Sequence, residues 1–283
     1  MAIIFALIAL IGWGVGDICV TIASRKLGFL VTYFWAFVFG LIVIVFMMPF
    51  MGGISDGRMF FFAILLNLIH TAGNLSFFRG LEVGNASIVG TITGTFSIVS
   101  VILSLIFFKE SVSWLQAIGI TFAGLGVILV SLKLGGTGKI SRFFADRGVS
   151  YAIVTLFCWG FYFAFVRIPA EKIGWFWAGV PLFLNAFLLL ASRDLRKNMG
   201  KIFADKKGLI STITFMLLGL IMADFAYNIG ILQGFTSIVA PIAGSSAVLF
   251  VILSRFVFGD RLNIQQKWGI AVTLLGILIV SFS

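Results

Sequence analysis

The feature that most constrains this chain is a succession of long apolar runs with very little hydrophilic sequence between them. Each run is about 20 residues long, the length at which an α-helix crosses the hydrocarbon core of a bilayer. A helix also satisfies its backbone hydrogen bonds internally, as any lipid-exposed segment must. The runs therefore predict ten transmembrane helices, at residues 2–22, 30–51, 58–79, 85–108, 112–132, 149–168, 174–192, 208–229, 236–258 and 264–282.

Composition agrees with a membrane protein, because 61% of the residues are hydrophobic and 11% are charged. A net charge of +10 would suggest nucleic acid in a soluble protein, but here the basic residues lie between apolar runs, where they face anionic lipid. We expect a multi-pass protein of the inner or plasma membrane, monomeric or homodimeric, with no nucleic-acid partner. Cys19 and Cys158 lie inside apolar runs without metal-ligand spacing, so we expect no metal site and no cofactor.

The chain consists of two similar halves. The glycine-containing, basic stretch 133–148 is the expected linker between a first repeat, residues 1–132, and a second, residues 149–283. At constant spacing, the segment Ser87-Ile88-Val89 recurs as Ser237-Ile238-Val239, and the segment Val101-Ile102-Leu103-Ser104 recurs as Val251-Ile252-Leu253-Ser254. Near the start of each half, Trp13-Gly14 recurs as Trp159-Gly160, and Lys26 and Gly28 recur as Lys172 and Gly174.

Five spans per half is an odd number, so the second copy must cross the membrane in the opposite sense to the first. The predicted fold is an all-α integral membrane protein of ten helices in two inverted five-helix repeats. In this architecture a site between the repeats opens to either side when one repeat rocks on the other.

The chain resembles the EamA-type, ten-helix members of the drug/metabolite transporter superfamily. The matching residues are the Trp-Gly pairs, the acidic residue that closes the fourth span of each half (Glu110 and Asp260), and the Gln-x-x-Gly that follows (Gln116 to Gly119, Gln266 to Gly269). The resemblance implies metabolite transport and both termini in the cytoplasm. The sequence departs from the family near Ser97 and Ala247, where many members carry proline; Pro241 lies about two turns away.

The loop charges favour the opposite orientation. Most Lys and Arg residues lie in the first, third, fifth, seventh and ninth connections, whereas the others contain Arg58, Lys109, Arg167 and Lys172. The positive-inside rule places the basic set in the cytoplasm and both termini outside. We take the charge distribution as the guide because it belongs to this sequence.

Two acidic residues, Asp17 and Asp224, lie well inside predicted spans, where ionisable groups are costly and commonly functional. The alternative is a structural carboxyl group bonded to a neighbouring helix. The counterpart of Asp224 in the first half is Asn74, and His70 lies one helical turn from Asn74 on the same face. Because their spans run in opposite directions, the two carboxyl groups are expected at different depths, which disfavours a catalytic dyad.

Further candidates for the substrate cavity are polar or aromatic residues inside spans. An aromatic residue in a span is more often a packing residue than a substrate contact. Small residues at Gly90, Gly94 and Thr93 favour close helix packing and leave the backbone free to bound a cavity. The remaining candidates are Trp13, Trp159, Tyr162, Asn185, Tyr227 and Asn228.

These features favour a secondary transporter, an exporter or exchanger of a small polar or amphipathic metabolite, with proton coupling as a further hypothesis. A passive facilitator or channel remains open. An integral membrane enzyme acting on a lipid-linked substrate is less favoured, because the sequence lacks an Asp-x-x-Asp pair, an HExxH segment and a phosphate-binding motif. We therefore expect no catalytic residues.

The orientation can be tested with single cysteines at Thr137 and Lys201 in a variant without Cys19 and Cys158. Both positions lie in the basic connections, so we expect them to resist an impermeant maleimide in intact cells. Labelling of both positions from outside would reverse the orientation.

Overall fold

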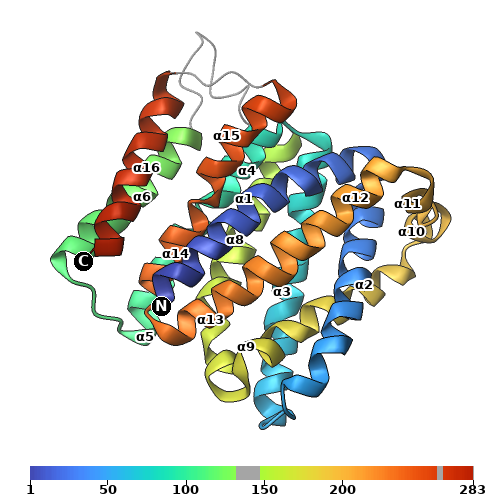
Figure 1. Cartoon of the computed structure of the whole chain (residues 1–283), viewed down its shortest axis with the longest axis horizontal. Helices are drawn as coiled ribbons and strands as arrows, with labels where there is room; N and C mark the ends of the chain where they lie inside the picture. The colour runs from blue at the N-terminus through green and yellow to red at the C-terminus, as the bar shows by residue number, and fades with distance from the viewer. Residues whose placement is uncertain (132–146, 260–263, 283) are drawn as a thin grey trace.

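The computed structural model describes residues 1–131, 147–259 and 264–282, and these ranges form a bundle of helices without strands (Figure 1). Residues 133–146 of the expected linker and Asp260 lie outside the described residues. The first half contains α1 (Ala2–Leu27), α2 (Phe29–Met47), η1 (Met48–Phe50), α3 (Gly57–Val83), α4 (Ala86–Gly94), α5 (Phe96–Phe108) and α6 (Trp114–Ser131). The second half begins with α8 (Arg147–Phe165), α9 (Arg167–Leu184), η2 (Asn185–Ala191), α10 (Arg193–Asn198) and α11 (Lys201–Ala204). It continues with α12 (Lys206–Phe215), the π-helical segment η3 (Met216–Asp224), α13 (Phe225–Gln233), α14 (Thr236–Gly244), α15 (Ser246–Phe258) and α16 (Ile264–Phe282).

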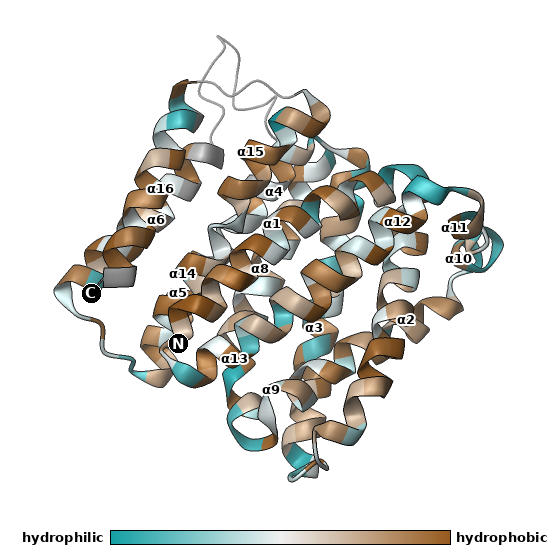
Figure 2. Cartoon of the chain, in the orientation of Figure 1, coloured by the Kyte–Doolittle hydropathy of each residue, from teal (hydrophilic) through white to brown (hydrophobic). Residues whose placement is uncertain are grey.

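Eight helical stretches of the described residues are long and apolar enough to cross a membrane, and they coincide with eight predicted spans. The other two predicted spans correspond to α6 and α16, which contain the shorter apolar stretches Trp114–Gly126 and Lys267–Val280. Hydrophobic residues cover the middle of the helices and hydrophilic residues gather at their ends (Figure 2). Large apolar side chains such as Phe46 (72% exposed) and Phe256 (77% exposed) point outward, as expected of a surface in contact with lipid. The chain is a multi-pass membrane protein.

The hydrophilic stretch 193–207 is more ordered than a loop, since it forms α10 and α11. Asp205 then caps α12 by accepting a hydrogen bond from the Gly208 N–H at 2.7 Å. Lys26, at the end of α1, forms an ion pair with the same carboxylate at 3.1 Å. The Gly208 N–H, and then Lys26, hold the pKa of Asp205 below its usual range.

Two glycines at equivalent positions in the halves share an unusual backbone conformation. Gly28 (φ 89°, ψ 147°) separates α1 from α2, and Gly174 (φ 84°, ψ 158°) kinks α9. This region of backbone space is open to glycine and strained for residues with a Cβ. The repeat therefore preserves backbone geometry as well as residue identity.

The fourth predicted span of each half is broken in the middle. The break falls at Thr95 between α4 and α5 and at Ser245 between α14 and α15, which are equivalent positions in the sequence repeat. The hydroxyl of Thr95 bonds to the Ile92 carbonyl at 2.6 Å, and that of Ser245 to the Pro241 carbonyl at 2.7 Å. Such bonds to the preceding turn bend helices, so the break in the first half forms without proline.

The first helix of each half packs against the other half. Helix α1 contacts α12, η3, α13, α14 and α15, whereas α8 contacts α3, α4 and α5. Glycines on α1 permit close approach to η3: a Cβ at Gly12 would lie 2.5 Å from the Leu218 carbonyl, and one at Gly16 would lie 3.2 Å from the Gly219 Cα. The two halves are thus interlocked and share one interior.

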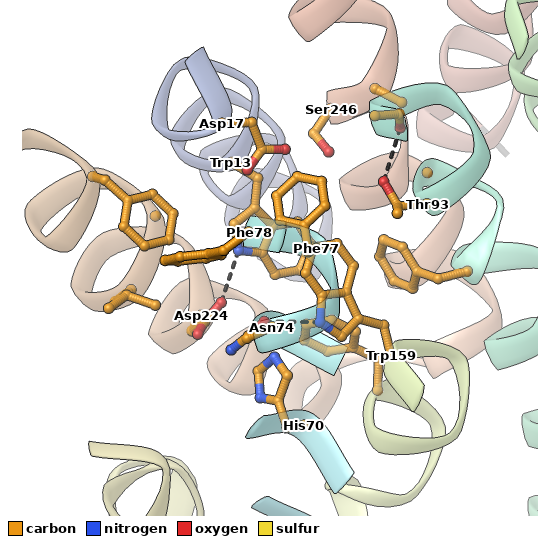
Figure 3. A pocket seen from close by; sticks show the side chains of 18 residues that line it. Trp13, Asp17, His70, Asn74, Phe77, Phe78, Thr93, Trp159, Asp224 and Ser246 are labelled. Carbon is orange, nitrogen blue, oxygen red and sulfur yellow. Dashed lines mark hydrogen bonds between the residues drawn. The ribbon is translucent and has the colours of Figure 1, made fainter. Parts of the chain in front are cut away.

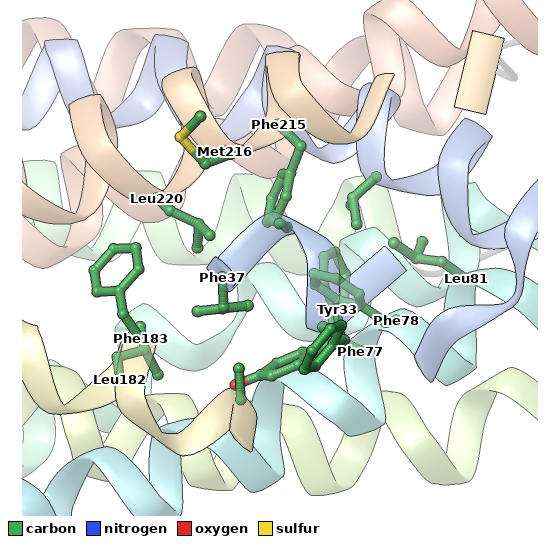
Figure 4. Close-up of a cluster of buried hydrophobic side chains, with 14 of the residues drawn as sticks. Tyr33, Phe37, Phe77, Phe78, Leu81, Leu182, Phe183, Phe215, Met216 and Leu220 are labelled. Atoms are coloured by element: carbon green, nitrogen blue, oxygen red, sulfur yellow. The ribbon is translucent and has the colours of Figure 1, made fainter. Parts of the chain in front are cut away.

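The interior is rich in aromatic side chains that connect α2, α3, α9, α12 and η3 (Figure 4). Tyr33 stacks on Phe37 with ring centroids 4.1 Å apart, and Phe78 meets Phe215 edge to face at 5.3 Å. Lipid tails are as apolar as these side chains, so contact packing rather than exclusion from water holds them together.

Helices α6 and α16 pack mainly on each other, at one side of the bundle (Figure 1). Glycines make this contact close: a Cβ at Gly276 would lie 2.6 Å from the Gly119 carbonyl and would also clash with the Ala123 backbone. These obstacles are backbone atoms, which cannot move aside as a flexible side chain can. The pair therefore depends on small residues at the crossing.

Replacing Gly276 with alanine should lower the free energy of unfolding by about 1–3 kcal/mol, because the added methyl group overpacks the α6–α16 contact. Gly200→Ala is the matched control, since a Cβ there would have no atom within 4 Å. Unfolding in mixed detergent micelles, followed by circular dichroism, measures both variants. Equal stability of the two would show that the crossing tolerates wider separation.

Candidate functional site

Two hydrogen bonds connect the halves at the centre of the bundle. The Trp13 indole Nε1 of α1 donates to Asp224 Oδ1 of η3 at 2.7 Å. The Trp159 indole Nε1 of α8 donates to Asn74 Oδ1 of α3 at 2.8 Å. Each tryptophan lies in the first helix of one half, and each acceptor lies in the third span of the other half. The two bonds are therefore counterparts in the repeat.

The local fold differs around the two acceptors. Asn74 lies in a continuous α-helix, α3, whereas Asp224 is the last residue of the π-helical segment η3. A π-helical turn changes the angle at which the following side chains leave the axis, and such turns are common at functional sites. Gly73 provides room beside Asn74, since a Cβ there would lie 2.8 Å from the Trp159 ring.

Both hydrogen bonds border one cavity between the halves (Figure 3). Its volume is about 30 Å³, room for about two water molecules. It is lined by residues of α1, α3, α4, α5, α8, α12, η3 and α15. In this conformation the cavity is smaller than a metabolite.

Six of the ten predicted site residues line the cavity: Trp13, Asp17, His70, Asn74, Trp159 and Asp224. A seventh, Tyr162, stacks on His70 with ring centroids 3.9 Å apart and an interplanar angle of 23°. The structure places the two carboxyl groups at the same cavity. The span directions had led us to expect them at different depths.

The other three predicted residues join helices beside the cavity. The Tyr227 hydroxyl donates to the Phe163 carbonyl at 2.9 Å, and Asn185 Nδ2 donates to the Thr71 hydroxyl at 3.0 Å. Asn228 Nδ2 reaches the Trp175 carbonyl at 3.4 Å. These contacts give the three side chains interhelical bonding partners.

Sequence reasoning missed most of the aromatic wall. The chain has 33 phenylalanines, so a cavity phenylalanine does not stand out from one that faces lipid. The small residues of the fourth span were a usable signal, because Gly90, Thr93 and Gly94 do line the cavity. The missed residues are Phe77, Phe78, Phe96, Phe163 and Phe215.

The cavity is acidic in composition. Asp17 and Asp224 are its carboxylic acids and His70 its imidazole, and no Lys or Arg belongs to its described lining. Within the described ranges, no group of three or more His, Cys, Asp or Glu side chains is arranged to hold a metal ion. The arrangement can accept hydrogen bonds, carry a proton and contact a flat or apolar ligand.

A second polar cluster joins the halves away from the cavity. The side chain of Glu110, just after α5, is 2% exposed and accepts hydrogen bonds from the N–H groups of Thr236 and Ser237 at 2.9 and 2.8 Å. These N–H groups begin α14, where the helix dipole favours a carboxylate. Arg167, at the start of α9, completes the cluster with a 2.9 Å bond to Glu110 and a 2.6 Å bond to the exposed Glu171.

Comparisons with known proteins agree with this architecture. The sequence profile described as the EamA-like transporter family matches residues 1–132 and again 146–282. A solved structure titled only as the crystal structure of a protein superposes with a TM-score of 0.76, covering 99% of this chain and 96% of that one. Its sequence is 14% identical, so the likeness concerns the fold alone. An uncharacterized protein of Methanocaldococcus jannaschii, MJ1333.1, is 32% identical over 80 residues, which span 28% of this chain and 58% of that protein.

Glu110→Gln should lower the free energy of unfolding by about 2–3 kcal/mol, because an amide leaves Arg167 without its buried counter-ion and cannot accept at both oxygens. Glu171→Gln is the matched control, since it removes the exposed partner of the same arginine. Unfolding in mixed detergent micelles compares the two. A similar small loss in both would mean that the Glu110 cluster contributes no more than a surface ion pair.

Proposed function

The chain belongs to the EamA-like transporter family, and from this premise we propose that it is a secondary transporter, an exporter or exchanger of a small polar or amphipathic metabolite across the cell membrane. The proposal includes ten transmembrane helices in two inverted five-helix repeats, residues 1–132 and 149–283, joined by the basic linker 133–148. Helices α6 and α16 are the two shorter spans in this count.

The pair of equivalent indole hydrogen bonds carries the proposal. Trp13 reaches from the first half to Asp224 in the second, and Trp159 reaches from the second half to Asn74 in the first. A relative rotation of the halves changes both contacts, and both border the cavity. This symmetry supports alternating access, in which the cavity opens to one side and then to the other.

The small cavity volume supports a gated carrier. At about 30 Å³ the cavity must widen before it admits a metabolite. The Glu110 cluster and the Lys26–Asp205 ion pair each join one half to the other. We infer that these contacts loosen in turn as the carrier opens.

Asp224 is the proposed proton-coupling group, because its counterpart Asn74 accepts the same kind of indole hydrogen bond without a titratable proton. A carboxylate in an apolar interior is costly, so proton binding or an arriving cation would stabilise the site. The titratable groups around Asp224 are Asp17 on α1, Tyr33 on α2, His70 on α3 and Tyr162 on α8. A change in the charge of Asp224 would thus alter the electrostatic environment of titratable side chains on four other helices.

Asp224→Asn tests this coupling with little structural change, because asparagine can accept from Trp13 as Asn74 accepts from Trp159. Proteoliposomes containing a pH-sensitive dye would be screened with one solute from each class: phenyltrimethylammonium, L-phenylalanine, glucose and uridine. For any solute that the wild type exchanges, the variant should still catalyse exchange. It should lose accumulation driven by a pH gradient.

The same experiment separates the rival functions. Saturable counterflow supports a carrier, whereas flux that rises linearly with solute concentration indicates a channel, and conversion of the solute indicates an enzyme. Accumulation that ignores the pH gradient in the wild type, or persists in Asp224→Asn, would remove proton coupling from the proposal.

A further inference from the structure

We propose that the cavity, in its widened conformation, binds an organic monocation, a protonated amine attached to an apolar body, with the positive nitrogen held at Asp17. This inference rests on the proposed transport function and specifies the class of substrate. It depends on the charge, the hydrogen bonding and the aromatic walls of the cavity.

The charges of the lining are unbalanced. Two carboxyl groups border the cavity, and its described lining provides no Lys or Arg to neutralise them. The Asp224 carboxyl group accepts one hydrogen bond, from the Trp13 indole at 2.7 Å. No described residue donates a hydrogen bond to the Asp17 carboxyl group. A carboxylate in such a place requires a proton, a cation or hydrogen-bond donors. A ligand ammonium group supplies both a positive charge and N–H donors.

The aromatic side chains of the cavity wall can pack against the apolar body of such a ligand. Trp13 lies one helical turn from Asp17 on the same face of α1, so its ring borders the space beside the carboxyl group. Trp159 stands nearly perpendicular to Phe96, with ring centroids 5.8 Å apart, and is tilted against Phe77 at 4.8 Å. The aromatic rings around the cavity therefore have different orientations. Aromatic faces attract cations and pack against apolar groups.

His70 gives an independent indication that the wall faces a ligand. Its side chain lines the cavity and is 2% exposed, yet Nδ1 has no hydrogen-bond partner among the described residues. Buried polar atoms are nearly always paired, so an unpaired one at a cavity wall marks a position where a ligand group can bind. In the tautomer with Nδ1 unprotonated, this nitrogen accepts a hydrogen bond from a ligand that donates one.

A zwitterion fits less well. The helix breaks at Thr95 and Ser245 could offer N–H groups to a ligand carboxylate, but the Ile98 and Val248 N–H groups that follow them are already bonded. The Ile98 N–H donates to the Thr95 carbonyl at 3.0 Å, and the Val248 N–H donates to the Ser245 carbonyl at 2.9 Å. A ligand carboxylate would instead lie near Asp17 and Asp224, where like charges repel.

The test uses four ligands with a common aromatic body and measures the apparent melting temperature of the full chain in detergent at neutral pH. The ligands are phenethylamine (cation), phenethyl alcohol (neutral), 3-phenylpropanoate (anion) and L-phenylalanine (zwitterion), each at up to about 10 mM, where a ligand of millimolar affinity gives a measurable shift. We expect the amine alone to stabilise the protein. Asp17→Asn should weaken its apparent Kd at least about tenfold.

Asp194→Asn is the control for loss of a carboxyl group, because Asp194 lies on α10 and contacts Asn198 at the surface. It should bind the amine as the wild type does. Should Asp17→Asn fail to fold, Asp17→Glu retains the charge and should retain the preference for the amine over the alcohol.

Stabilisation by the alcohol or the anion as strong as that by the amine would overturn the inference. So would unchanged amine affinity in Asp17→Asn, or stabilisation by none of the four ligands. Binding in detergent does not require transport, so the two proposals fail separately. A carrier with saturable flux of a neutral solute refutes the cation site alone, whereas selective amine binding without saturable flux refutes the carrier alone.

Discussion

The indole hydrogen bond between Trp13 and Asp224, with its counterpart between Trp159 and Asn74, is the interaction on which the centre of this molecule depends. In a lipid-embedded bundle, lipid tails offer no hydrogen bonds to the side chains of Asp224 and Asn74, so their partners come from the protein. Here each partner comes from the opposite half. The requirement brings α1 beside η3 and α8 beside α3, and the cavity forms where these contacts meet.

Small residues and backbone irregularities make this interlocking possible. Gly12 and Gly16 let α1 approach η3, and Gly73 admits the Trp159 ring. The halves also share a positive-φ glycine, Gly28 in one and Gly174 in the other. They share a left-handed residue after the broken fourth span as well, at Lys109 in one half and Gly259 in the other. The backbone geometry is therefore the same at both places, and at the second the residue types differ.

The sequence predicted the repeat and eight of the apolar spans that the described residues contain, because both depend on composition and residue order. It also brought Asn74 and Asp224 together as counterparts and identified six cavity residues. The π-helical segment at Asp224 and the break at Thr95 were not predictable, since neither follows from a proline or a change in hydropathy. Tyr227 and Asn228 were polar residues in an apolar span, and only three-dimensional packing distinguishes a helix-joining side chain from one on the cavity wall.

In the mechanism that we propose, this cavity opens alternately to both sides of the membrane under the control of a titratable contact between the halves. A cysteine at Ser246, a buried cavity residue, tests it in a background without Cys19 and Cys158. An impermeant methanethiosulfonate would be applied to right-side-out and inverted vesicles over a range of pH. We expect labelling from both sides, with a ratio between the two labelling rates that changes with pH. Labelling from one side at every pH, or a ratio that does not depend on pH, would contradict it.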